Sequence, residues 1–296
     1  MSKIQDALKK LQKEGPPPSA SPKKLRNGFV HGEQPSSIPI ARKKKVTIDG
    51  PKHHVEQQAL VDAGLLAPLD HAIPVADEFR RIKRPLITNA TQGLADAADH
   101  MNVIMIASAL PKAGKTFCSV NLAVSISLER ELNVLLVDAD VAKPHISREF
   151  GLAEAPGLID LLVDDGRSIE ETLVRTDLND IQILPAGSGH PQATELLASE
   201  RMSQIVDELA TRYPDRIILL DSPPLLITSE AQALASQVGQ IALVVEAGET
   251  NHQTLLQAID VLNSDKAINV ILNKSRHASQ PGYYGGEYGY YGYEGS

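Results

Sequence analysis

The fold is decided by one stretch of sequence, Val103-Ile-Met-Ile-Ala-Ser-Ala-Leu-Pro-Lys-Ala-Gly-Lys-Thr116. Its apolar first half has the composition of a buried strand, and a helix is expected to begin near Lys115. The stretch matches the phosphate-loop pattern G-x-x-x-x-G-K-[ST] except at the first position, where Ala109 stands instead of glycine. Backbone N–H groups and the positive end of the following helix can bind phosphates in such a loop. The sequence therefore predicts a nucleotide site, in which Lys115 reaches the β- and γ-phosphates.

Residues in and around this loop are the predicted nucleotide contacts. Gly114 lets the backbone approach the phosphates closely, whereas Lys112 and Ala113 stand where glycine is more common, which predicts a stiffer loop. Asn273 ends the last expected strand, and it is interpreted either as a hydrogen-bonding partner of a purine edge or as a turn residue. The predicted ligands are ATP and Mg²⁺, and the predicted ATP-binding residues are Pro111, Lys112, Ala113, Gly114, Lys115, Thr116, Phe117 and Asn273.

Short apolar runs alternate with helical patterns from about residue 75 onward. Near-continuous runs of Val, Ile and Leu are typical of strands that are buried on both faces of a sheet. The alternation predicts an α/β fold with a mostly parallel, doubly wound sheet, whose functional loops lie at the carboxyl ends of the strands. The expected strands are 103–107, 134–137, 181–184, 217–220, 241–245 and 270–272. The expected helices are 77–94, 115–130, 157–163, 193–212, 229–237 and 252–263, and Pro85 is expected to kink or divide the first of them.

Two further expected strands end in carboxylates. Asp138 and Asp140 follow the strand at 134–137, and Asp221 follows the strand at 217–220. Mg²⁺ prefers oxygen ligands, and carboxylates at this edge of the sheet suit it. The predicted metal-binding residues are Thr116, Asp138 and Asp221, and the predicted catalytic residues are Lys115, Asp138, Asp140 and Asp221. Either Asp140 or Asp138 is expected to accept a proton from the acceptor group.

The first fifty residues differ in charge from the rest of the chain. They hold eleven Lys and Arg against four Asp and Glu, although the whole chain has a net charge of −8. Such a basic arm favours anionic lipid or nucleic acid, or it only keeps the chain in solution; nucleic acid is not expected, because no aromatic residues are interleaved with the cluster at residues 42–45. We predict a short amphipathic helix over 1–14, a basic Pro- and Ser-rich linker over 15–70, the nucleotide-binding domain over 71–276 and a tail over 277–296, with a disordered arm and tail.

The last fourteen residues hold six of the seven tyrosines of the chain, set among glycines. Such a segment cannot pack a core, so the phenols are expected to be accessible. Beside an ATP site they suggest a kinase that phosphorylates its own tail. The predicted phosphoacceptors are Tyr283, Tyr284, Tyr288, Tyr290, Tyr291 and Tyr293.

The cysteine count and the hydropathy of the sequence indicate where in the cell the protein lies. The one cysteine, Cys118, excludes an internal disulfide and is expected to be a small core residue. No apolar run approaches the roughly 18 residues that a membrane-spanning helix needs, and the polar start is not typical of a signal peptide. We therefore expect a cytoplasmic location.

Together these motifs resemble the bacterial tyrosine kinases, whose phosphate-loop fold is of the MinD/ParA type. Residues 107–116 look like the Walker A motif of that family, 135–140 like its second acidic motif, and 218–224 like its Walker B motif. Residues 2–8 and 78–86 look like the subgroup of exopolysaccharide tyrosine autokinases that is associated with exosortase (XrtA). The E-x-x-R-x-x-R pattern that joins subunits into a ring in the family is matched by Glu78, Arg81 and Arg84.

The resemblance implies autophosphorylation of the tail of a neighbouring subunit, in the regulation of exopolysaccharide synthesis or export. It implies a homo-oligomeric ring, a membrane-embedded activator of the chain-length-regulator class, a possible phosphotyrosine phosphatase and a position at the inner face of the cytoplasmic membrane through that activator. Two positions depart from the family pattern: Lys143 replaces the usual arginine after the second acidic motif, and Lys112 replaces a glycine. Neither departure removes a predicted metal ligand or the phosphate-binding Lys115, so activity is expected.

Two other functions fit parts of the sequence. A MinD/ParA-type ATPase would share the fold, but such proteins carry an extra lysine five residues before the loop lysine, where this chain has Leu110. A nucleotide-gated scaffold would use the tail only to adhere to partners or glycans. A phosphotyrosine signal from the protein would separate the kinase from both.

Overall fold

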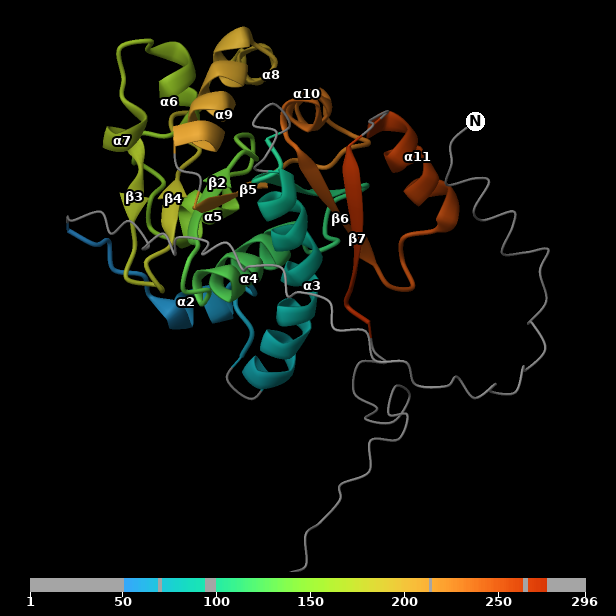
Figure 1. Ribbon diagram of the computed structural model, residues 1–296. Coiled ribbons are helices and arrows are strands. Elements are labelled where there is room, and N and C mark those ends of the chain that lie inside the picture. Colours follow the sequence, from blue (N-terminus) through green and yellow to red (C-terminus); the bar gives the residue numbers. More distant parts are fainter. Residues whose placement is uncertain (1–50, 69–70, 94–99, 213–214, 263–265, 276–296) are drawn as a thin grey trace, which may run out of the picture. The chain divides into compact units, whose positions relative to one another are not determined.

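The computed structural model describes residues 51–68, 71–93, 100–212, 215–262 and 266–275, all within the compact unit Arg42–Ser296 (Figure 1). The predicted helix at 1–14, the linker up to residue 50 and the tyrosine tail lie outside the described residues. Within the described residues, the elements form one sheet with helices on both of its faces.

The sheet has seven strands in the order β3-β4-β2-β5-β1-β6-β7. Every neighbouring pair is parallel except β3 and β4, which are antiparallel. The mostly parallel α/β fold predicted from the sequence is therefore confirmed. The strands are β1 (Val103–Ser108), β2 (Asn133–Asp138), β3 (Val174–Arg175), β4 (Gln182–Leu184), β5 (Arg216–Asp221), β6 (Gln240–Glu246) and β7 (Ala267–Asn273).

Successive residues of the central strands belong to two different apolar cores. In β1, Met105 packs into one core, and its neighbours Ile104 and Ile106 pack into the other. This alternation is the period-two geometry of a strand that is covered on both faces. The first core lies under α6 (Leu158–Val163), α7 (Ile169–Thr172), α8 (Ala193–Leu197), α9 (Glu200–Arg212), α10 (Ser229–Gln237) and α11 (His252–Leu262); the second lies under α2 (Gln57–Asp62), α3 (Ala72–Gly93), α4 (Lys115–Ser127) and α5 (His145–Glu149).

Two predicted helices differ from the structure. The pattern over 193–212 forms two helices, because the Ser199 hydroxyl accepts a hydrogen bond from the Met202 amide (3.3 Å) and caps the start of α9. Pro85 was expected to kink or divide the helix at 77–94, and division is wrong, since α3 runs unbroken through Pro85. Phe79 and Leu86 lie on either side of Pro85, and both are buried in the core under α3. This packing offsets the hydrogen bond that proline cannot donate.

Residues 51–68 correct the predicted linker, which extended to residue 70. They pack on the domain: Leu60 of α2 is fully buried, and Val55 is buried beside it. The His53 amide donates to the Arg175 carbonyl (2.7 Å), and the His53 carbonyl accepts from the Asp177 amide (3.0 Å). The segment 51–56, named here the docking segment, thus adds a short parallel bridge outside β3. Residues 51–56 contain too few alternating hydrophobic positions for a strand to be predicted there from the sequence.

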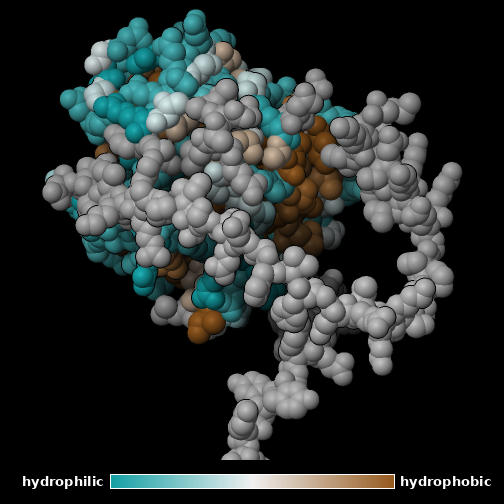
Figure 2. All heavy atoms as spheres, in the orientation of Figure 1, coloured by the Kyte–Doolittle hydropathy of each residue, from teal (hydrophilic) through white to brown (hydrophobic). Residues whose placement is uncertain are grey.

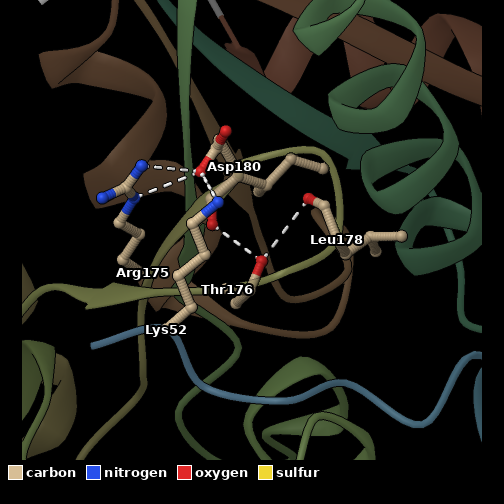
Figure 3. A network of polar contacts seen from close by, with 6 residues as sticks. Lys52, Arg175, Thr176, Leu178 and Asp180 are labelled. Carbon is tan, nitrogen blue, oxygen red and sulfur yellow. Dashed lines mark hydrogen bonds and ion pairs between the residues drawn. The ribbon is translucent and has the colours of Figure 1, made fainter. Parts of the chain in front are cut away.

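Side chains also hold the docking segment at the sheet edge (Figure 3). Lys52 and Arg175 both contact the Asp180 carboxylate, at 2.6 and 2.8 Å. Thr176, which follows Arg175 in the chain, donates its hydroxyl to the Ile181 carbonyl at 2.8 Å. This hydrogen bond closes the turn that carries Asp180. These pairs lie near the surface, so each contributes on the order of 1 kcal/mol or less.

The opposite edge of the sheet is uncovered among the described residues. There β7 pairs with β6 only, and its side chains Val270 and Leu272 are exposed. Figure 2 shows apolar surface at this side of the molecule. No helix in the described part of the chain is long and apolar enough to cross a membrane.

Candidate functional site

The phosphate loop lies between the end of β1 and the start of α4, as predicted. Gly114 has φ +91°, which favours glycine, and a Cβ atom there would displace the side-chain amide of Asn273. Lys112 also has a positive φ, +69°, in the conformation that glycine adopts most easily. This explains why glycine is common at that position, and it supports the prediction of a constrained loop.

The end of β7 holds the loop in place. Asn273 donates its side-chain amide to the Ala113 carbonyl (2.8 Å), and Lys274 donates to the Lys112 carbonyl (2.7 Å). Lys274 also pairs with Glu246 at the end of β6 (2.8 Å). Asn273 is thus a support of the loop, a role that the sequence did not indicate, and its contact with a purine stays a prediction.

Asp221 ends β5 directly under the loop. It is buried, and its two oxygens accept from the Thr116 hydroxyl (2.8 Å) and the Ser119 hydroxyl (2.9 Å). Burial raises the pKa of Asp221 to about 6, and the Lys115 ammonium opposes the shift. The carboxylate therefore orients Thr116, while both of its own oxygens already have protein donors.

Asp138 ends β2 in register with Asp221 on the neighbouring strand. It is fully buried, and its Oδ2 accepts from both the amide and the hydroxyl of Ser147, each at 2.7 Å. Its Oδ1 has no hydrogen-bond partner among the described residues. Burial raises the pKa of Asp138 to about 7, against the lowering effect of Ser147. An orphaned buried carboxylate oxygen is costly unless a cation, water or ligand meets it, so it is a suitable cation ligand.

Asp140 lies two residues beyond the end of β2 and lines a cavity beside the loop. It is half-buried, and burial raises its pKa, with the charge of Lys115 as the largest opposing influence. Asp140 and Lys115 line the same cavity, whereas Asp138 does not. The sequence offered either carboxylate as the proton acceptor, and in the structure only Asp140 lines the cavity that Lys115 lines.

Two neighbouring cavities surround the loop. The smaller, of about 480 Å³, is lined by Lys115, Thr116 and Asp140 together with Pro111, Lys112 and Lys143. The larger, of about 660 Å³, lies between α3 and the end of β7 and has mostly apolar walls, with Asn273 in its lining. Gly64, Gly114 and Phe117 line both cavities.

The other predicted residues lie at the rim or in the core. Glu78, Arg81 and Arg84 are exposed on α3, and the first two line the larger cavity; their role between subunits stays a prediction. Cys118 is buried, as predicted, and burial raises its pKa to about 12, which keeps the thiol protonated. The six tail tyrosines lie outside the described residues.

Sequence reasoning missed several residues of the site. Ser119 was foreseeable, because it lies one helical turn after Lys115 on the same helix. Ser147 was not, because its contact with Asp138 depends on the turn into α5. Residues 63–65 were assigned to a linker, and they line the smaller cavity.

Comparisons with known proteins agree with this geometry. The family model described as AAA domain matches residues 101–273. A tyrosine-protein kinase of Bacillus subtilis, YwqD, is 30% identical over 194 residues, which cover 65% of this chain and 78% of YwqD. The tyrosine-protein kinase Wzc of Salmonella typhimurium is 30% identical over 267 residues, covering 88% of this chain but only 34% of Wzc.

A solved structure extends the agreement to the fold. The kinase domain of the Escherichia coli tyrosine kinase ETK is 28% identical, with a TM-score of 0.55, and the match covers 65% of this chain and 74% of that domain. The family resemblance predicted from the three acidic and phosphate-binding motifs is confirmed by these matches. This chain belongs to the bacterial tyrosine kinase family, on a phosphate-loop α/β fold.

Proposed function

We propose that the protein is a tyrosine autokinase, which transfers the γ-phosphate of ATP to tail tyrosines of a neighbouring subunit. One observation carries the proposal: the loop lysine, the Thr116–Asp221 hydrogen bond and the buried, unpartnered oxygen of Asp138 all lie at the same edge of the sheet. The names of YwqD, Wzc and ETK support the reaction type. The six tail tyrosines provide acceptors within the same chain.

The two cavities suit the two ends of a nucleotide. The smaller cavity is lined by Lys112, Lys115 and Lys143, whose charges favour phosphate. The larger cavity is mostly apolar and has Asn273 in its lining, which suits a purine base. ATP bound in this way would pass Gly114, whose missing side chain leaves the backbone open to the phosphates.

The residues at the strand ends fit a magnesium ion. Oδ1 of buried Asp138 offers a carboxylate oxygen that no described group satisfies, and Thr116 offers a hydroxyl. Asp221 would act mainly by holding Thr116, because Thr116 and Ser119 occupy its oxygens. When bound, Mg²⁺ would neutralise charge on the β- and γ-phosphates.

Asp140 is the better placed proton acceptor. It lines the cavity in which the phosphates would lie, and its raised pKa makes it a stronger base than an exposed carboxylate. The tyrosine oxygen would attack the γ-phosphorus, its proton would pass to Asp140, and the bond to the bridging oxygen would break with release of ADP. Lys115 would stabilise charge on the transferred group. A phenol of pKa about 10 reacts poorly at neutral pH, so positioning supplies much of the rate.

Transfer between subunits would require an assembly that brings one tail to the next site. Glu78, Arg81 and Arg84 present charged side chains on the exposed face of α3, beside the larger cavity. Each added phosphate contributes about −1.5 to −2 charge, so a phosphorylated tail on a chain of net charge −8 would repel its neighbours and loosen the ring.

A membrane-embedded activator, a phosphatase and a role in exopolysaccharide export complete the proposal, which places the protein at the inner face of the membrane.

Mass spectrometry of protein incubated with ATP and Mg²⁺ tests the proposal. We expect phosphate on the tail tyrosines of the full chain, and a loss of nearly all phosphotyrosine when all six are replaced by phenylalanine. Undiminished phosphotyrosine in that variant would show that the phosphoacceptors lie outside the tail. Absence of phosphotyrosine from a wild-type chain that binds ATP would favour the ATPase or the scaffold over the kinase.

A further inference from the structure

The loop of residues 63–65 reaches the nucleotide site from outside the phosphate-loop motif. Its three residues line the smaller cavity together with Lys115 and Thr116. Gly64 also lines the larger cavity, to which Asn273 belongs. The 63–65 loop therefore lies where the two cavities adjoin.

Hydrogen bonds fix this loop in one conformation. The amides of Ala63, Gly64 and Leu65 donate to carbonyls of the preceding helix α2, at 2.8–2.9 Å. The Leu65 carbonyl accepts from the side-chain amide of Asn121 (2.8 Å). Asn121 belongs to α4, the helix whose first turn carries Lys115 and Thr116. The loop is thus attached to the same helix that positions the phosphate-binding residues.

Gly64 adds no side chain to the junction of the two cavities. It has φ +70°, and no heavy atom lies within 4 Å of the place where a Cβ atom would be. A side chain at this position would occupy open space beside both cavities rather than collide with the fold. The left-handed turn that ends α2 accounts for the glycine, and the open space means that no packing contact would exclude a side chain there.

We propose that the 63–65 loop is a nucleotide-contacting element and that the backbone of Gly64 packs against the ribose of bound ATP or ADP. The inference rests on the proposed function, because it takes one nucleotide to occupy both cavities. The element belongs to the docked N-terminal part of the chain. Nucleotide binding and docking of residues 51–68 then strengthen one another by the same factor. A bound nucleotide would therefore stabilise the docking segment at the sheet edge beside β3.

Calorimetry of the full chain with the Gly64→Asn substitution tests the contact. Asparagine tolerates a positive φ better than other side chains, so the loop is expected to keep its conformation. We expect MgADP to bind about tenfold or more weakly, whereas magnesium tripolyphosphate, which lacks ribose, binds within about twofold of wild type. Gly248→Asn is the matched control, because Gly248 has φ +79°, similar open space and no part in either cavity; its MgADP affinity is expected to be unchanged.

Hydrogen exchange of the wild-type chain provides a measurement that needs no variant. MgADP is expected to slow amide exchange across residues 57–66 and, through the docking segment, at His53. Equal MgADP affinity of Gly64→Asn and wild type, loss of tripolyphosphate affinity in parallel, or unchanged exchange at 57–66 would each overturn the inference. If wild type binds MgADP but one of these three outcomes is found, the loop contact is wrong and the kinase proposal stands. If wild type binds no MgADP, the loop contact and the kinase proposal are both wrong.

Discussion

The phosphate-loop end of the sheet and the edge beside β3 are held by different kinds of contact. At the first, Asp138 and Asp221 are buried, and every oxygen but one has a protein donor. At the second, the pairs Lys52–Asp180 and His54–Asp177 lie near the surface, where solvent screens them. Changes at the phosphate-loop end should therefore abolish chemistry with little loss of folding, whereas changes at the docked edge should release a segment and alter chemistry indirectly.

Replacement of Lys115 by methionine should have the largest effect. Methionine fills similar space in this buried position but cannot stabilise charge on the transferred phosphoryl group, so the rate of autophosphorylation should fall on the order of 1000-fold. Initial rates measured with a phosphotyrosine antibody check the loss. The melting temperature should stay close to that of wild type. Rapid phosphorylation by this variant would remove the phosphate loop from the mechanism.

The Asp138→Asn substitution should have the next largest effect, and it sharpens the contrast between the two strand ends. It neutralises the carboxylate that has an open oxygen, so the Mg²⁺ concentration needed for half-maximal ATP binding should rise about 10- to 100-fold. Asp221→Asn is the comparison variant, and it should instead weaken binding by misplacing Thr116. Calorimetric titration of Mg²⁺ at fixed ATP measures both. An unchanged Mg²⁺ requirement in Asp138→Asn would assign the metal to other residues.

Shortening Leu60 to alanine tests the docked edge. Leu60 is fully buried in α2, and such a truncation typically costs about 2–5 kcal/mol. We expect local undocking rather than global unfolding, seen as faster amide exchange over residues 53–65, with a smaller loss of autophosphorylation than in Lys115→Met. Ile73→Ala is the control, since Ile73 is exposed at the start of α3 and should change neither quantity. Faster exchange at 53–65 without any loss of activity would contradict the proposed link between docking and chemistry.

The smallest effect is expected at His54, as a dependence on pH. The hydrogen bond and charge of Asp177 raise the pKa of His54 above 6.5, and the same contact lowers the pKa of Asp177. A raised folded-state pKa means that the stabilisation is fully present below pH 6.5 and is lost as pH rises through the folded value. Docking measured by limited proteolysis should therefore weaken slightly from pH 6 to pH 8.5 in wild type. It should not change with pH in His54→Gln, and an identical pH dependence in that variant would contradict the assignment.

The parts of the molecule that depend on local pattern were predictable from the sequence. The strands at 103–107 and 217–220 and the helix at 229–237 follow from apolar periodicity, and Lys115 and Thr116 follow from a contiguous motif. Ser147 and the 63–65 loop were not predictable, because their contacts with the site join segments that are far apart or carry no motif. The docking segment was missed for a further reason: it is stabilised by backbone pairing and ion pairs, which leave no hydrophobic pattern.

Transfer of phosphate between two different chains is the central claim, and a mixing experiment tests it most directly. The Lys115→Met chain keeps its six tail tyrosines but cannot phosphorylate them, and the chain with six phenylalanines keeps the phosphate loop but has no tail acceptors. When the two are combined with ATP and Mg²⁺, mass spectrometry should find phosphate on the tail of the Lys115→Met chain. A mixture in which that tail stays unmodified, although wild type alone becomes phosphorylated there, would contradict the account.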